Sequence, residues 1–152
     1  MTDGWTGALG SQPFFCRCDK LQGEYKEGKR HGQGSFRAAD GTEYVGSYED
    51  GLENGVGRIT FPSGAVYTGE FLDGKRSGKG SFTYADGSVY EGEYLNDLKH
   101  GVGRLTYING DVFEGRMYEG KRWGRGSFTF ADGESFVGHY KVWFLHPPAA
   151  VF

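Results

Sequence analysis

The chain is poor in the residues and segments on which several classes of protein depend. It has two cysteines in 152 residues, Cys16 and Cys18, which are too few and too close together for a disulfide scaffold. We expect free thiols in a reducing compartment, and no metal or other cofactor, because no zinc-site spacing is present. No apolar run approaches the roughly 20 residues of a membrane-spanning helix, and the first residues lack the pattern of a secretory signal.

The chain also lacks a strong charge of one sign and any catalytic motif. Its 17 Lys+Arg and 20 Asp+Glu residues give a net charge of −3, whereas general nucleic-acid binding requires a strongly basic face. The Gly78-Lys79-Gly80 type of pair lacks the third glycine and the helix of a dinucleotide loop. His31 and His100 occupy the same position three repeats apart and cannot share one centre. We therefore expect neither a nucleic-acid partner nor enzyme activity.

Glycine, in contrast, is abundant and periodic. All of the 28 glycines except Gly4, Gly7 and Gly10 fall into columns whose members are 23 residues or a multiple of 23 apart. Glycine is unfavourable in regular structure unless the backbone needs positive φ or a close approach, and repeats of this length indicate a stacked array. The predicted units are residues 21–43, 44–66, 67–89, 90–112 and 113–135, with a partial unit at 136–140.

Each unit predicts one β-hairpin. Tyr44, Gly46 and Tyr48 alternate with the residues between them at the period of a strand, and a second strand follows at 57–61. The Gly-, Asn- and Asp-rich segment 49–55 is predicted to be the loop within the hairpin. Asp-Gly and Asn-Gly pairs, such as Asp40-Gly41, are predicted to form type I′ turns between units. The predicted fold is all-β, an elongated single-layer antiparallel sheet of consecutive hairpins.

Aromatic residues recur in columns, which predicts a ladder of rings over glycines on one face of the sheet. A one-layer sheet cannot bury both faces, so a curved sheet would present this face as a groove for a helix or an extended peptide. The alternative is that the rings fill the groove by packing on one another. The predicted partner-binding residues are Tyr44, Tyr48, Tyr67, Phe71, Tyr90, Tyr94 and Phe113.

A second candidate site is a broken basic column in the predicted loops. Stacking would align it along one edge, where it could bind phosphoinositide headgroups or an acidic partner. The alternative is ordinary solvated loop charge. A tryptophan in this column is either packed on its neighbours or a binding anchor. The predicted residues are Lys29, Arg30, Lys75, Arg76, Lys99, Lys121, Arg122 and Trp123.

The two ends depart from the repeat. Residues 1–20 are either an irregular lead or a degenerate half-repeat that caps the array, since Pro13–Cys16 falls where later units have a second strand. Residues 141–152 form an apolar tail. This tail either covers the last aromatic rung or leaves an open edge at 136–145 that recruits a second chain.

The units YVGSYEDGLENGVGRITFPSG, YTGEFLDGKRSGKGSFTYADG, YEGEYLNDLKHGVGRLTYING and FEGRMYEGKRWGRGSFTFADG resemble MORN (membrane occupation and recognition nexus) repeats. The resemblance covers residues 21–140. Leu21, Asp97 and Met117 depart from the pattern. The resemblance implies an elongated, curved β-hairpin sheet and a non-catalytic scaffold, which we expect to bind a protein partner. Peripheral binding to anionic membranes through the basic column is the alternative function. The resemblance also implies a cytoplasmic location, with cytoskeletal or ciliary association, and self-association as a structural component is a further expectation.

Overall fold

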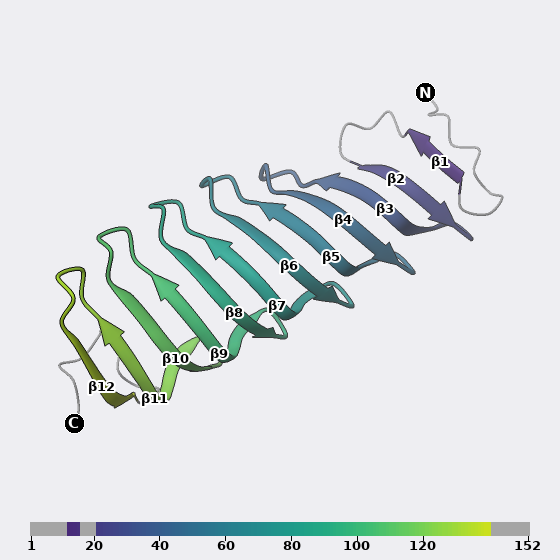
Figure 1. The fold of residues 1–152 in the computed structure, drawn as a ribbon. Coiled ribbons are helices and arrows are strands. Elements are labelled where there is room, and N and C mark those ends of the chain that lie inside the picture. Colours follow the sequence, from purple (N-terminus) through teal and green to yellow (C-terminus); the bar gives the residue numbers. More distant parts are fainter. Residues whose placement is uncertain (1–11, 16–20, 141–152) are drawn as a thin grey trace. The chain divides into compact units, whose positions relative to one another are not determined.

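The computed structural model describes residues 12–15 and 21–140 (Figure 1). All regular secondary structure in this part of the chain is β-strand, so it holds no helix that could cross a membrane. The chain divides into two compact units, Met1–Lys75 and Arg76–Phe152, which we describe separately.

Each unit is an open antiparallel sheet in which every strand pairs with the next one along the chain. The predicted fold class, an antiparallel sheet of consecutive hairpins, is therefore confirmed. The strands of the first unit are β1 (Gln12–Phe15), β2 (Leu21–Lys26), β3 (Lys29–Arg37), β4 (Glu43–Glu49), β5 (Leu52–Thr60) and β6 (Val66–Leu72). Those of the second are β7 (Lys75–Thr83), β8 (Val89–Leu95), β9 (Leu98–Thr106), β10 (Val112–Tyr118), β11 (Lys121–Thr129) and β12 (Ser135–Tyr140).

The ends of the described chain meet the expectations only in part. β1 pairs antiparallel with β2, with Phe14 opposite Gly23, so a strand lies where the sequence places a degenerate half-repeat. At the other end, β12 pairs with β11. The predicted open edge at 136–145 is described only as far as Tyr140, and the tail 141–152 lies outside the described residues.

The type I′ turns lie within the hairpins, not between consecutive 23-residue repeats as the sequence predicted. Asp50 and Gly51 have φ values of 51° and 89°, and Glu49 pairs with Leu52 on either side of them. Two consecutive residues with positive φ make a type I′ turn. The prediction of a loop over 49–55 is therefore wrong, because the second strand already begins at Leu52.

The Asp-Gly pairs between consecutive repeats form a different type of turn. Gly41 has a φ of 97°, whereas Asp40 is not among the residues with positive φ. The amide of Gly41 donates to the Ala38 carbonyl at 3.0 Å and that of Ala38 to the Thr42 carbonyl at 2.8 Å. Asp40 Oδ1 accepts the Thr42 amide at 2.8 Å. This is a type I turn followed by a left-handed glycine, and the aspartate stabilises it through its side chain.

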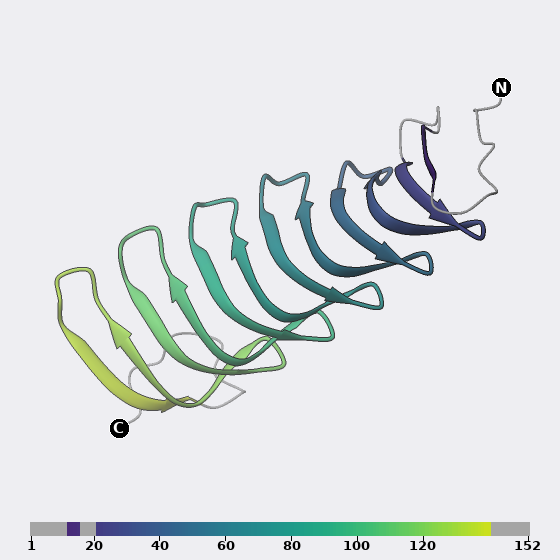
Figure 2. The same cartoon turned by 45° about the vertical axis from the view of Figure 1, so that its right-hand side comes forward.

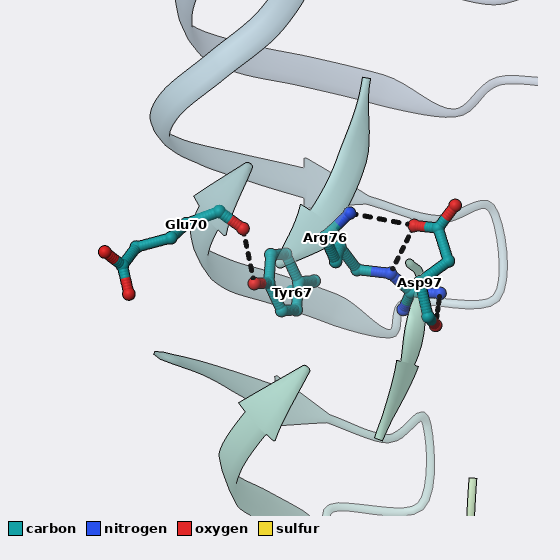
Figure 3. A network of polar contacts seen from close by, with 4 residues as sticks. All are labelled: Tyr67, Glu70, Arg76 and Asp97. Carbon is teal, nitrogen blue, oxygen red and sulfur yellow. Dashed lines mark hydrogen bonds and ion pairs between the residues drawn. The ribbon is translucent and has the colours of Figure 1, made fainter. Parts of the chain in front are cut away.

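A β-bulge interrupts the β2–β3, β4–β5, β8–β9 and β10–β11 hairpins at the same place, and in the β4–β5 hairpin it frees a carbonyl. Gly46 pairs with Gly57, but the next pair is Tyr48 with Glu53. Ser47 therefore has no partner in β5, and its carbonyl accepts a hydrogen bond from Tyr44 Oη at 2.9 Å. The equivalent bond joins Tyr67 Oη to the Glu70 carbonyl at 3.0 Å (Figure 3). Bulges bend strands, and Figure 2 shows curved strands in each hairpin.

The aromatic rings lie directly over paired glycines. A Cβ on Gly57 would meet the Tyr44 ring at less than the 3.0 Å that real Cβ atoms keep, and one on Gly103 would meet the Tyr90 ring in the same way. Only glycine leaves room for these rings, so the predicted ladder of rings over glycines is confirmed. Each ring then packs edge to face on others, as in the contact of Tyr44 with Phe71, whose centroids are 5.1 Å apart.

Candidate functional site

The predicted aromatic site is largely an interior. Tyr67 and Tyr90 are 0% exposed and Phe113 is 1% exposed, and the other four members of the set are 4–5% exposed. Edge-to-face contacts join neighbours such as Tyr90 and Tyr94, with centroids 5.5 Å apart. The rings thus pack on one another, which was the alternative reading of this face. Direct binding by these seven residues stays a prediction. Their low exposure leaves little side-chain surface for a partner.

The basic column does not form a loop edge, because its residues lie in strands. The short type I′ turns place them at the first residues of β3, β7, β9 and β11, where successive side chains point to opposite faces. The column therefore divides between the two faces. Arg30, Arg76, Lys99 and Arg122 lie on the aromatic face, and Lys29, Lys75, Lys121 and Trp123 lie on the opposite face.

The four cations of the aromatic face lie over rings. The Arg30 guanidinium lies 4.7 Å from the Tyr48 ring centroid, and that of Arg76 lies 5.4 Å from Tyr94. In the second unit, Lys99 Nζ lies 4.8 Å from the Tyr90 ring. Arg122 likewise lies 5.1 Å from the Phe113 ring. Such cation–π contacts attract the cation to the ring face, so within each unit the basic and aromatic columns form a mixed surface.

Two of these arginines also hold the hairpin that follows them. Arg30 Nη2 donates to the Gly51 carbonyl at 2.9 Å, while the Gly51 amide donates back to the Arg30 carbonyl at 2.8 Å. Arg76 and Asp97 are related in the same way, 21 residues apart. Arg30 and Arg76 therefore have a structural role that a pattern of solvated loop charge does not predict.

Lys99 is in a different situation. Its Nζ donates to the Tyr84 hydroxyl, and no carboxylate is paired with it within the described residues. Burial, together with the positive charges of Arg76 and Arg122, lowers the pKa of Lys99 to about 8. The corresponding residue of the first unit is Glu53, paired with Tyr48. Three consecutive cations therefore lie on the aromatic face of the second unit, whereas Arg30 and Glu53 alternate in the first.

A hollow of about 190 Å³ opens on the aromatic face of the second unit. The residues that line it are Arg76, Phe82, Tyr84, Tyr94, Asp97, Leu98, Lys99 and Gly120, so the carboxylate that pairs with Arg76 also borders the hollow. Phe82 and Tyr84 are half-buried and lie with ring centroids 4.7 Å apart. The site prediction missed them, although their columns were recognised as aromatic. Their position could have pointed to them, because they lie at the end of the second strand of the repeat, away from the first aromatic residue of the repeat.

The opposite face carries a smaller aromatic cluster. Trp123 and Tyr118 have ring centroids 6.3 Å apart, and Tyr118 also contacts His100. Both Trp123 and Tyr118 are 44% exposed, so the tryptophan is packed on a neighbour and still accessible. No group of three or more metal-ligating side chains occurs in the part of the chain with described coordinates.

Three comparisons place this architecture among known proteins. None of the curated proteins matches the chain. Among solved structures, the fold resembles the SAS-4 (dCPAP) TCP domain of Drosophila melanogaster, solved in complex with a proline-rich motif of Ana2 (dSTIL). That match has a TM-score of 0.50 and 15% identity, and it covers 82% of this chain and 68% of the other. The MORN repeat pattern matches residues 22–43, 44–66, 67–89, 90–112 and 113–135. These consecutive matches cover most of the sequence, and the chain belongs to the MORN repeat family.

Proposed function

We propose that the chain is a non-catalytic scaffold that binds an extended protein segment on the aromatic face of its second unit. The hollow at Tyr84 carries this proposal, because accessible aromatic surface and basic side chains meet there. Concave sites lined by aromatic side chains and a few polar groups are the usual binding sites of proteins. The buried rings support the surface from below, and the half-buried Phe82 and Tyr84 contact the partner.

The likeness to the SAS-4 TCP domain supports this kind of partner. That domain is bound to a proline-rich motif, and proline-rich segments dock on aromatic surfaces at a low cost in conformational entropy. A proline ring needs only an accessible aromatic face and a nearby hydrogen-bond donor. Tyr84 supplies the ring, and Lys99 supplies the donor group.

Photo-crosslinking tests the proposal directly. A benzophenone amino acid replaces Tyr84 in one variant and Val102, 60% exposed on the opposite face, in the matched control. After irradiation in cell lysate, we expect a polypeptide adduct from position 84 and none from position 102. Equal adducts at both positions, or adducts at position 102 alone, would overturn the assignment of the binding face.

We also propose, as an alternative, peripheral binding of anionic phospholipid. The exposure of Lys29, Lys75 and Lys121 supports it, because exposed cations attract anionic headgroups by about 1 kcal/mol each. Sedimentation with phosphatidylserine vesicles should then decrease when all three lysines are replaced by Ser. Binding that ignores the lipid charge would contradict this alternative.

Self-association and location complete the proposal. A second copy could pair with β12 at the edge of the second unit, and light scattering tests this through a mass that rises with concentration. We place the scaffold in the cytoplasm, with cytoskeletal or ciliary association as in other proteins with this repeat. Fluorescence microscopy of the tagged chain tests that location.

A further inference from the structure

On the aromatic face of the second unit, Lys99 and Arg122 carry positive charge that no acidic side chain balances within the described residues, whereas Arg76 is paired with Asp97 at 3.2 Å. Lys99 and Arg122 each have a tyrosine hydroxyl as partner, Tyr84 and Tyr107. Within the described residues neither cation forms an ion pair, whereas the exposed Arg104 of the same unit does so with Glu114 at 3.5 Å. Half-buried cations without a counter-charge are unfavourable in the free protein, and an anionic ligand would neutralise them.

These cations are evenly spaced. Arg76, Lys99 and Arg122 are the second residues of β7, β9 and β11, so two strand spacings separate neighbours. Strands lie about 4.8 Å apart in a sheet, which places successive cations about 9.6 Å apart. A ligand that meets all three must therefore present an anionic group at about this interval, in a direction across the strands.

Among regular peptide conformations, polyproline II fits this interval best. It has three residues per turn and rises about 3.1 Å per residue, so residues on the same side recur every three positions, about 9.3 Å apart. In an extended strand, residues on the same side recur about 6.8 Å apart. An α-helix presents the same side every seven residues, about 10.5 Å apart. Its mismatch with the spacing of the cations is about 0.9 Å per repeat, against about 0.3 Å for polyproline II.

The aromatic residues beside the cations suit the other two positions of such a turn. Tyr84 and Tyr107 are half-buried and occupy the same position in successive repeats, so they have the same spacing as the cations. Proline rings pack on aromatic faces of this kind. An acidic residue facing each cation and prolines facing the tyrosines would therefore fill one polyproline turn per repeat.

We propose that this face binds a polyproline II segment whose acidic side chains recur every third residue and meet Arg76, Lys99 and Arg122. The proposal rests on the proposed function and specifies the partner at that site. The first unit is less suited to such a ligand, because Glu53 occupies the position of the middle cation. Lys99 is the central residue of the row. Its side chain bonds the Tyr84 hydroxyl, and its bond to the following turn is made by the backbone carbonyl, which accepts the Gly120 amide at 2.9 Å and is kept when the side chain is replaced.

Two peptides of identical composition test the spacing. Each has twelve residues, nine prolines and three glutamates. Glutamate occupies the first, fourth and seventh positions in one peptide and the first, fifth and ninth in the other. With the full chain in fluorescence anisotropy, we expect the first peptide to bind at least about threefold more tightly, the scale of one or two partly exposed ion pairs. Equal affinities, or no binding of either peptide, would overturn the proposal.

Variants of two lysines in the same unit test the residues. Lys99→Met should reduce the difference between the peptides, and Lys99→Arg should restore it by returning the charge. Lys121→Met removes the same charge from the opposite face and should leave both affinities unchanged. If Lys121→Met weakens binding as much as Lys99→Met, the attraction is unspecific and the proposal fails.

The photo-crosslinking and the peptide-binding experiments together separate this inference from the proposed function. A polypeptide crosslinked at position 84 that lacks acidic residues at every third position would keep the scaffold function and reject the spacing. The absence of any adduct at position 84 would reject both.

Discussion

Arg76 donates three hydrogen bonds to Asp97, the second residue of the following type I′ turn, and its carbonyl accepts a fourth from the Asp97 amide at 3.0 Å. Asp97 Oδ1 accepts the Arg76 backbone amide at 3.0 Å and its Nε at 3.2 Å, and Arg76 Nη2 donates to the Asp97 carbonyl at 2.9 Å (Figure 3). Asp97 has a φ of 72°, in a position where other repeats have glycine, such as Gly51. The carboxylate therefore offsets the strain that an L-residue meets in this conformation.

This relationship predicts different effects for two substitutions of Asp97. Asp97→Ala keeps the strained backbone and loses the carboxylate bonds, so it should lower the free energy of unfolding by about 1–2 kcal/mol. Asp97→Gly loses the same bonds but removes strain of about 1 kcal/mol, so it should remain within about 1 kcal/mol of the parent. Urea denaturation measures both, and an equal loss would show that the strain is negligible.

The rings over glycines predict a graded cost for adding a methyl group. A Cβ on Gly103 meets the Tyr90 ring and its hydroxyl, whereas a Cβ on Gly126 meets the Phe113 ring at 2.8 Å. Both alanine variants overpack the sheet, which costs about 1–3 kcal/mol. Gly103→Ala should lower the melting temperature more, because phenylalanine has no hydroxyl in the way. A smaller effect at Gly103 than at Gly126 would contradict this packing.

The tyrosine hydroxyl over the bulge predicts a stabilising hydrogen bond. Tyr90 Oη donates to the Glu93 carbonyl at 3.2 Å, so Tyr90→Phe should destabilise the fold by about 1 kcal/mol. Tyr140 is the matched control, because its buried hydroxyl has no hydrogen-bond partner within the described residues. Tyr140→Phe should be neutral or stabilising in thermal denaturation, and equal losses would argue against the Tyr90 bond.

The environment of Lys99 predicts a stability that depends on pH. Arg76, Arg122, Tyr84 and Tyr90 face its ammonium group, and its pKa in the fold is about 8, below the ordinary 10.5. Between these values the unfolded chain binds the additional proton, so stability should rise as the pH passes from about 8 towards 10. Above pH 10 the raised pKa of Tyr90, about 12, acts in the opposite direction, because the unfolded chain then loses the proton first.

Lys99→Met isolates this contribution. The variant should be at least as stable as the parent at pH 7, by up to about 1 kcal/mol, because it removes a desolvated cation. Its stability should also rise less between pH 8 and 10, which urea denaturation at several pH values measures. An unchanged rise would show that other groups titrate in this range.

Local sequence patterns identified the repeat, the strands and the pairing of rings with glycine. These features depend on contacts within one repeat and with its neighbour, and the same residue pattern recurs in every repeat. The same patterns misplaced the turns, because both Asp50-Gly51 and Asp40-Gly41 suit a type I′ turn in isolation. The pairing registers of the two strand pairs decide between them. Glu49 opposite Leu52 leaves two residues in the β4–β5 turn, whereas the Ala38–Thr42 hydrogen bond leaves three in the β3–β4 turn.

By itself, the sequence determined an antiparallel array of MORN hairpins with one aromatic face. Only the tertiary structure decided which residues that face leaves accessible. The rings that define the repeat bury one another, so Tyr67 and Tyr90 are interior, while Tyr84 remains half-buried. Tertiary structure also decided that Lys99 belongs to the aromatic face and Lys121 to the other. One residue along a strand reverses the direction of the side chain, and the exact start of the strand depends on how the hairpin closes.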